Sequence, residues 1–173
     1  SDNYVYDVNQ SSKTMISPKM GSELINSAAL SLGIAVILIL LYITIRFNSF
    51  FALSSILALV HDITITFGIF IIFNLEISLP IIAAFLTILG YSLNDTIVIF
   101  DRIRENLKTL KRGSIIDTVN KSINESLSRT VVTSLTTLIV VLILYIFGGE
   151  VIHYFSFALI IGVLVGTYSS IFV

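Results

Sequence analysis

Five apolar stretches separated by polar links recur along the chain. They run over residues 24–45, 50–73, 79–100, 130–147 and 153–173. Each is 18 to 24 residues long, and about 20 helical residues are needed to cross the ~30 Å hydrocarbon core of a bilayer. The stretches do not show the alternation of period two that is typical of barrel strands. The pattern therefore predicts an all-α polytopic membrane protein with five transmembrane helices, because lipid cannot form hydrogen bonds to exposed backbone groups.

The polar links fall into two classes by charge. The long link, residues 101–129, carries seven Lys and Arg residues, and the first short link carries Arg46. The links at 74–78 and 148–152 carry Glu76 and Glu150 and no Lys or Arg. Positive charge gathers on the cytoplasmic side of membrane proteins. We therefore expect loop 101–129 to be cytoplasmic and residues 1–23 to lie outside.

Residues 1–23 carry no export signal of their own. They are polar, begin with Ser1, and lack a positively charged lead followed by an apolar core. Their expected outer location therefore predicts a signal or helix upstream of this sequence. The last apolar stretch reaches Val173 without a flanking charge. We expect the chain to be a fragment of a longer protein.

Within the long polar link, apolar residues recur at helical spacing on both sides of Gly113. They are Ile103, Leu107 and Leu110 before it, and Ile116, Val119, Ile123 and Leu127 after it. Ser114 with Asp117 resembles a capping box. The spacing predicts two short amphipathic helices that lie along the membrane surface.

Composition supports a membrane protein and excludes several functional classes. Hydrophobic residues make up 55% of the chain and charged residues 12%, about half the charged fraction of soluble domains. The net charge of −1 leaves too little positive surface for nucleic-acid binding. The absence of cysteine excludes disulfides, thiolate metal sites and a cysteine nucleophile. We expect no catalytic residue and no metal site.

Two acidic residues lie inside apolar stretches, where charge is costly. Asp62 follows His61 in the second stretch, and Asp95 follows Asn94 in the third. An ionised carboxylate at the centre of a span costs ~3 kcal/mol, so such residues face the bundle interior and usually have a function. Burial favours the protonated form, which suits proton uptake and release. Alternatively, both acids only hydrogen-bond neighbouring helices, and His61 satisfies Asp62 or a backbone carbonyl.

Arg129 opens the fourth stretch and has two interpretations. By its position it is a positive anchor at the cytoplasmic interface. Thr133, Thr136 and Val140 lie on the same helical stripe. If this stripe faces the bundle, the guanidinium reaches toward Asp95 and biases its protonation. A proton arriving at Asp95 would then release Arg129 and act as a switch.

The last stretch carries a small residue at every fourth position. Ala158, Gly162, Gly166 and Ser170 form an extended small-xxx-small ridge, which lets another helix approach closely. The pattern predicts a helix contact and leaves open whether the partner helix belongs to this chain or to another protein.

Several ordered motifs resemble the SecF family of protein-export membrane subunits. Residues 90–96, Gly-Tyr-Ser-Leu-Asn-Asp-Thr, and residues 100–106, Phe-Asp-Arg-Ile-Arg-Glu-Asn, resemble its signature. Similar motifs follow the family order at residues 17–24, 42–47, 61–62, 127–130, 147–149 and 166–170. The resemblance covers nearly the whole chain, and the number of motifs makes it specific.

The resemblance implies a fold from the resistance-nodulation-division (RND) superfamily. That family has six transmembrane helices with an exterior domain between the first and second. Residues 1–23 would then be the end of the exterior domain, with a leftover strand at residues 4–8. Residues 24–173 would form helices two to six, half of a pseudo-symmetric SecD/SecF bundle.

The resemblance also implies a function and site residues. The family couples the proton-motive force of the bacterial cytoplasmic (inner) membrane to preprotein translocation. Its partners are SecD and the SecYEG channel with SecA, and protons are its coupling ion, without a further cofactor. By this resemblance Asp95 is the proton-responsive carboxylate and Arg129 its basic partner, while Asn94, His61 and Asp62 support them.

Two alternative functions stay open. One is a small-molecule or lipid permease of the same superfamily, which would carry large exterior domains. The other is an intramembrane aspartyl protease, in which Asp62 and Asp95 on consecutive helices activate water. Against the protease, Ser92, Leu93 and Asn94 precede Asp95, in place of the Gly-x-Gly that such enzymes show.

Overall fold

The structure, a computed structural model, describes residues 18–47, 49–109 and 114–173. In these ranges it forms five helices: α1 (Pro18–Arg46), α2 (Ser49–Ile72), α3 (Leu79–Thr109), α4 (Ile115–Phe147) and α5 (Gly149–Phe172). All five are long and apolar enough to cross a membrane. The predicted all-α architecture with five spans is confirmed.

α1 begins earlier than the apolar pattern predicts. The pattern assigns residues 1–23 to a polar outer segment, whereas residues 18–23 form the first turns of α1. The first turn of a helix tolerates polar residues, and proline suits its first position because the missing N–H has no partner there. The rest of the predicted outer segment, including the expected strand at residues 4–8, lies outside the described residues.

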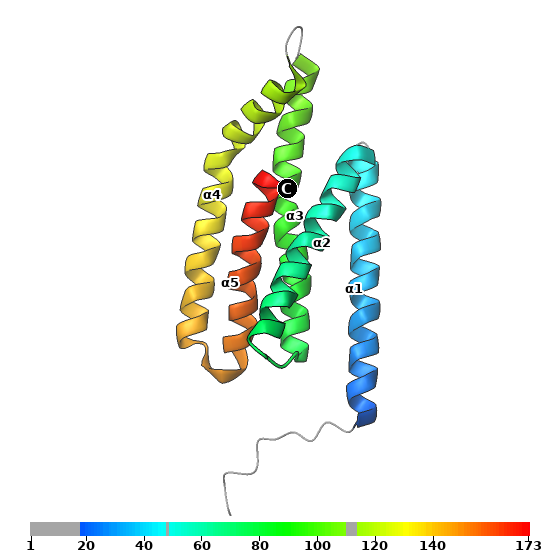
Figure 1. The fold of residues 1–173 in the computed structure, drawn as a ribbon, viewed down its shortest axis with the longest axis vertical. Helices are drawn as coiled ribbons and strands as arrows, with labels where there is room; N and C mark the ends of the chain where they lie inside the picture. The colour runs from blue at the N-terminus through cyan, green and yellow to red at the C-terminus, as the bar shows by residue number, and fades with distance from the viewer. Residues whose placement is uncertain (1–17, 48, 110–113) are drawn as a thin grey trace, which may run out of the picture.

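α3 and α5 lie side by side in the bundle, with α4 on one side of them and α2 on the other (Figure 1). α1 stands at the edge, next to α2 and α3. The links α1–α2 and α3–α4 lie at one end (Figure 1), which we call the basic end because Arg46, Arg102 and Arg104 are near these links in the sequence. The opposite end, with Glu76 and Glu150, is the acidic end.

The two links at the acidic end turn through residues that tolerate a left-handed backbone. Asn74, after α2, has φ 52°, and Gly149, at the start of α5, has φ 75°. Asparagine and glycine adopt this conformation with the least strain. The N–H of Leu75 then donates to the carbonyl of Phe70 at 2.9 Å. Tight turns therefore hold α2 beside α3 and α4 beside α5.

In the polar segment 101–129, residues 101–109 form the end of α3 and residues 115–129 the start of α4. The prediction of helices in this segment is right, but their predicted course along the membrane surface is wrong. α3 and α4 run without a break for 31 and 33 residues, about 46 and 50 Å at ~1.5 Å per residue. Both exceed the ~30 Å of hydrocarbon. Their polar ends therefore extend beyond the span as an antiparallel pair (Figure 1).

Hydrogen bonds between the two polar extensions explain this orientation. Nε of Arg102 donates to Oε2 of Glu125 at 2.7 Å. Nδ2 of Asn106 donates to the same oxygen and to Oγ of Ser122, at 2.9 Å each. The bonds from Asn106 and Arg102 hold the pKa of Glu125 below its usual value. Ser114 occupies the N-cap position of α4 without a side-chain capping bond, so cross-helix contacts rather than the cap stabilise the pair.

The small-residue ridge of α5 packs against α3 of the same chain. A Cβ added at Gly162 would collide with the side chain of Ile88, and one at Gly166 would lie 3.1 Å from Cβ of Ser92. Ala158 is fully buried at the same interface. Small side chains let the two helix backbones approach closely, so α3 and α5 form the core that positions the buried polar residues.

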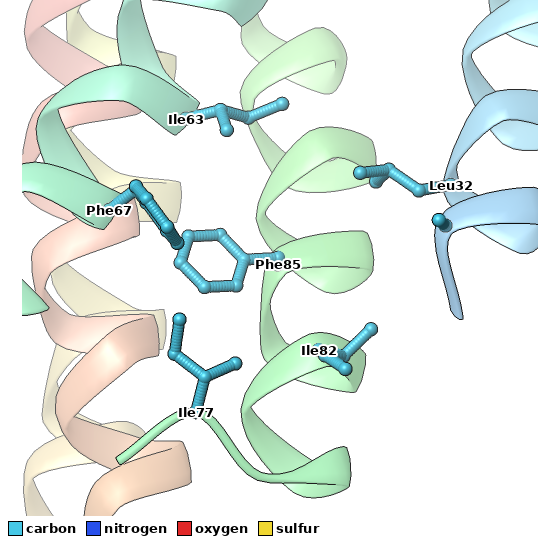
Figure 2. A pocket seen from close by; sticks show the side chains of 7 residues that line it. Leu32, Ile63, Phe67, Ile77, Ile82 and Phe85 are labelled. Carbon is cyan, nitrogen blue, oxygen red and sulfur yellow. The ribbon is translucent and has the colours of Figure 1, made fainter. Parts of the chain in front are cut away.

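An apolar cavity of about 390 Å³ separates α1 from α2 and α3 (Figure 2). Its lining consists of Ala29, Leu32, Ile63, Phe67, Ile77, Ile82 and Phe85. Substrate pockets combine an apolar lining with a few precisely placed polar groups. Since these side chains carry no polar group, the cavity is not a candidate site for a polar substrate.

Candidate functional site

Asp62 lies where α2, α3 and α5 meet, and it is fully buried. Its Oδ2 accepts hydrogen bonds from Oγ of Ser92 at 2.5 Å and from Oγ of Ser169 at 2.8 Å. Its Oδ1 lies 3.0 Å from Nδ1 of His61. The imidazole of His61 also stacks on Tyr168 of α5, with 6.5 Å between ring centroids. Three helices therefore fix the carboxyl of Asp62 through short contacts to both oxygens.

Asp95 lies one turn beyond Ser92 on α3, facing α4, and is 3% exposed. Its Oδ2 accepts from Oγ of Ser134 at 3.4 Å, and its Oδ1 accepts from Nδ2 of Asn94 at 3.5 Å. Oγ of Ser134 itself accepts from Oγ1 of Thr167 on α5 at 2.7 Å. The two bonds to Asp95 are at the upper limit of hydrogen-bond length. Its carboxyl is therefore buried but loosely held.

Arg129 lies near the Asp95 carboxyl, within range of a charge–charge interaction. Within residues 18–47, 49–109 and 114–173, however, no ion pair shorter than 4.0 Å includes Arg129. The side chain is exposed, and Oγ1 of Thr133 donates to its backbone carbonyl at 3.0 Å. Arg129 therefore lies at the edge of the Asp95 site.

The stripe predicted to carry Arg129 into the bundle is divided. Thr133 is half-buried beside Asp95, whereas Thr136 and Val140 are exposed. α4 packs through Ser126, Thr130 and Ser134, which are buried. These hydroxyl side chains are small, and they allow a closer approach to α3 and α5 than Val140 would.

The two acids are not brought together in one catalytic pair. Asp62 binds Ser92 and Ser169, whereas Asp95 binds Ser134 and Asn94, so the carboxyls share no partner. An aspartyl protease requires two carboxyls that share a proton. In the part of the chain that the structure describes, no group of three or more potential metal ligands occurs either. The geometry shows two separate buried carboxyls and does not support the paired carboxyls of an aspartyl protease.

Sequence reasoning missed four hydroxyl residues that surround these acids: Ser92, Ser134, Thr167 and Ser169. One signal was available, because Ser122, Ser126, Thr130 and Ser134 recur at every fourth position of α4. On α5 the predicted ridge ends at Ser170, whose Oγ donates to the carbonyl of Thr167. The neighbouring Ser169, outside the ridge pattern, is the residue that binds Asp62.

Comparison with known families gives one match that covers the chain. The family described as "Protein export membrane protein SecD/SecF, C-terminal" matches residues 1–173. The chain is 52% identical over 161 residues to Protein translocase subunit SecF of Desulfurispirillum indicum, covering 91% of this chain and 51% of that protein. It is 53% identical over 165 residues to SecF of Rhodothermus marinus, covering 92% and 54%.

Solved structures show the same similarity. A crystal structure of SecDF from Thermus thermophilus, a translocon-associated membrane protein, superimposes with a TM-score of 0.86 at 50% identity. The alignment covers 90% of this chain and 22% of SecDF. A second structure, SecDF in a super-membrane-facing form, gives a TM-score of 0.78 at 48% identity, covering 91% and 21%. The chain thus spans about half of the SecF relatives and about a fifth of SecDF.

Proposed function

The chain belongs to the SecD/SecF family of protein-export membrane proteins, and we propose that it is the proton-coupling part of a Sec translocase subunit. In this proposal the proton-motive force across the bacterial cytoplasmic (inner) membrane drives preprotein translocation. SecD and the SecYEG channel with SecA are its partners. The relatives are named translocase subunits, which supports a transport role without a catalytic residue.

The observation that carries the proposal is the loose environment of Asp95. A carboxyl that changes protonation during a cycle must be desolvated, yet it must not be locked in one state by strong hydrogen bonds. Asp95 meets both conditions, because it is 3% exposed and its bonds to Ser134 and Asn94 are 3.4 and 3.5 Å long. A proton on Asp95 would cancel its attraction for Arg129. The favoured arrangement of α3 and α4 would then change.

The available energy is sufficient for such a step. Moving one charge through 100 mV releases about 2.3 kcal/mol, which shifts a two-state population about fortyfold. The proton is the only coupling ion the proposal needs. No further cofactor takes part.

The exposed polar side chains beside Asp95 support SecD as the partner. Asn94 and Arg129 are exposed in this chain, although polar side chains inside a membrane span normally face a protein interior. A second helix bundle over α3 and α4 would cover them. A relative from Thermus thermophilus is named SecDF, and this chain matches 22% of it, which agrees with a SecD half in contact with a SecF half.

The orientation follows from the charges at the two ends. Arg46, Arg102 and Arg104 lie at the basic end, whereas Glu76 and Glu150 lie at the acidic end. The positive-inside rule places the basic end, with the α3–α4 extensions, in the cytoplasm.

Asp95→Asn and Arg129→Ala, in the full-length subunit assembled with SecD, test the proposal. Asp95→Asn keeps the shape of the side chain but removes its proton exchange. We expect it to abolish the acceleration of preprotein translocation by an imposed proton gradient, with ATP-driven translocation by SecA unchanged. Arg129→Ala should reduce the same acceleration at least tenfold. The measurements are preprotein import into inverted membrane vesicles and proton flux in proteoliposomes.

Asp117→Asn is the matched control, because Asp117 is an exposed acid in the first turn of α4, away from Asp95. This variant should retain full coupling. Normal gradient-dependent import and proton flux in both Asp95→Asn and Arg129→Ala would refute the proposal.

A further inference from the structure

A polar cavity of about 160 Å³ lies at the basic end, where α1, α2 and α3 meet. Ile45, Arg46, Phe47, Phe51 and Arg104 line it. It is separate from the sites of Asp62 and Asp95, neither of which lines it. Two guanidinium groups from helices far apart in the sequence thus share one concave site.

Both guanidiniums are held in place and keep donors available. Nη2 of Arg46 donates to Oδ1 and Oδ2 of Asp101 at 2.9 and 3.1 Å, and its Cζ lies 5.1 Å from the ring centroid of Phe47. Nη1 of Arg104 donates to the backbone carbonyl of Arg46 at 3.3 Å. A guanidinium carries five N–H donors. The remaining donors are preorganised for a ligand with several acceptor oxygens.

The local charge favours an anion. Arg46 and Arg104 contribute two positive charges, and Asp101, paired with Arg46, contributes one negative charge. Arg102 turns to the opposite side of α3, where it pairs with Glu105 and Glu125. The net charge at the cavity is therefore positive. Arginine pairs preferentially with phosphate because its planar fork matches the phosphate oxygens.

The exposed surface of α1 next to the cavity favours a phospholipid as the source of the phosphate. Ile45, which lines the cavity, is 78% exposed. Large exposed apolar side chains continue from it down α1 at helical spacing: Leu41, Leu38, Ile34 and Leu30. A phosphate in the cavity would therefore have an apolar track directly beneath it. A phospholipid has this combination of an anionic headgroup and acyl chains, whereas a free anion does not.

We propose that Arg46 and Arg104 form a binding site for the phosphate of an anionic phospholipid, with its acyl chains along α1. Basic pockets between transmembrane helices on the cytoplasmic side bind anionic lipid headgroups in this way. The bound lipid bridges α1 to α3. It stabilises the edge of the bundle where the apolar cavity leaves α1 loosely packed.

Native mass spectrometry of the full-length protein, with phosphatidylglycerol as the probe, tests the site. We expect Arg104→Gln to weaken phosphatidylglycerol binding about tenfold, the effect of one charge-assisted hydrogen bond. Asp101→Asn should strengthen it several-fold, because it frees Arg46 from its competitor. Phosphatidylcholine, which has the same phosphate but no net charge, should bind at least tenfold more weakly than phosphatidylglycerol.

Arg102→Gln is the matched control, since it removes the same charge from α3 outside the cavity. It should change phosphatidylglycerol binding less than twofold, and thermal melting in detergent shows that each variant is folded. Equal losses in Arg104→Gln and Arg102→Gln would overturn the site in favour of general surface charge. Inorganic phosphate that binds as tightly as phosphatidylglycerol would also overturn it, because the acyl chains would then contribute nothing.

Discussion

Asp62 and Asp95 are both buried acids on neighbouring helices, yet their surroundings differ. Asp62 has three partners at 2.5, 2.8 and 3.0 Å, from α3, α5 and its own helix. Asp95 has partners at 3.4 and 3.5 Å and the charge of Arg129 nearby. Burial alone therefore does not distinguish the two acids. The length and number of their hydrogen bonds do, and under the proposed function Asp95 is the acid that switches.

This difference means that the two carboxyls connect the helices in different ways. The Asp62 site joins α2, α3 and α5 into one unit, because losing any partner leaves a buried hydroxyl or carboxyl unsatisfied. At the Asp95 site the bond to α4 is longer, 3.4 Å from Oγ of Ser134. Under the proposed function, the weaker connection at Asp95 is the one that protonation changes.

The largest effect expected from this comparison is on stability. Asp62→Ala removes two interhelical hydrogen bonds, each of which contributes about 0.6 kcal/mol in membranes, and the contact to His61 on its own helix, so we expect the free energy of unfolding to fall by more than about 1.2 kcal/mol. Asp95→Ala should cost less than about 1 kcal/mol, because its bonds are long. The free energy of unfolding of the full-length protein in detergent measures both. Equal losses of unfolding free energy in Asp62→Ala and Asp95→Ala would contradict the difference between the two sites.

A smaller effect is expected from displacing a partner of Asp62. In Gly166→Ala the new methyl group meets Cβ of Ser92 at 3.1 Å, and the shift lengthens the bond from Ser92 to Asp62. We expect the free energy of unfolding to fall by about 1 kcal/mol, which is at the low end of the range for overpacked side chains. Gly90→Ala is the control on α3, since a Cβ there meets nothing within 4 Å. That variant should leave stability unchanged or raise it by about 0.5 kcal/mol.

The smallest effect on stability is expected from replacing one hydroxyl partner of each acid. Ser169→Ala removes a 2.8 Å bond to Asp62 and should cost about 0.6 kcal/mol. Ser134→Ala removes a 3.4 Å bond to Asp95 and the bond from Thr167, whose hydroxyl keeps the carbonyl of Val163 as a partner. It should cost less than Ser169→Ala, while it alters gradient-driven export. Unfolding and vesicle import, measured on the same two variants, provide the comparison. A Ser134→Ala variant less stable than Ser169→Ala would contradict it.

The sequence predicts the five spans well because each depends on local hydrophobicity alone. It also predicts that Asp62 and Asp95 are buried, since exposure of either to lipid is costly. The sequence does not predict the partners of Asp62, because Ser92 and Ser169 lie 30 and 107 residues away from it. Nothing local distinguishes Ser169 from the neighbouring Ser170 until the rotation of α5 against α3 is known.

The polar segment 101–129 shows the same limit. Its periodicity correctly predicts helices, but periodicity contains no information about the angle between a helix and the membrane. That angle is set by contacts such as the one between Arg102 and Glu125, 23 residues apart. The exposure of Thr136 and Val140 on α4 has the same origin, because packing against α3 and α5 selects the smaller side chains on another face.

The continuity of α3 has a mechanical consequence. The helix runs unbroken from Asp95 to Thr109, a distance of about 21 Å at ~1.5 Å per residue. An unbroken helix of this length transmits a tilt to its end. Under the proposed function, a rigid tilt of α3 by about 10° about Asp95 would displace Thr109 by roughly 4 Å over that length.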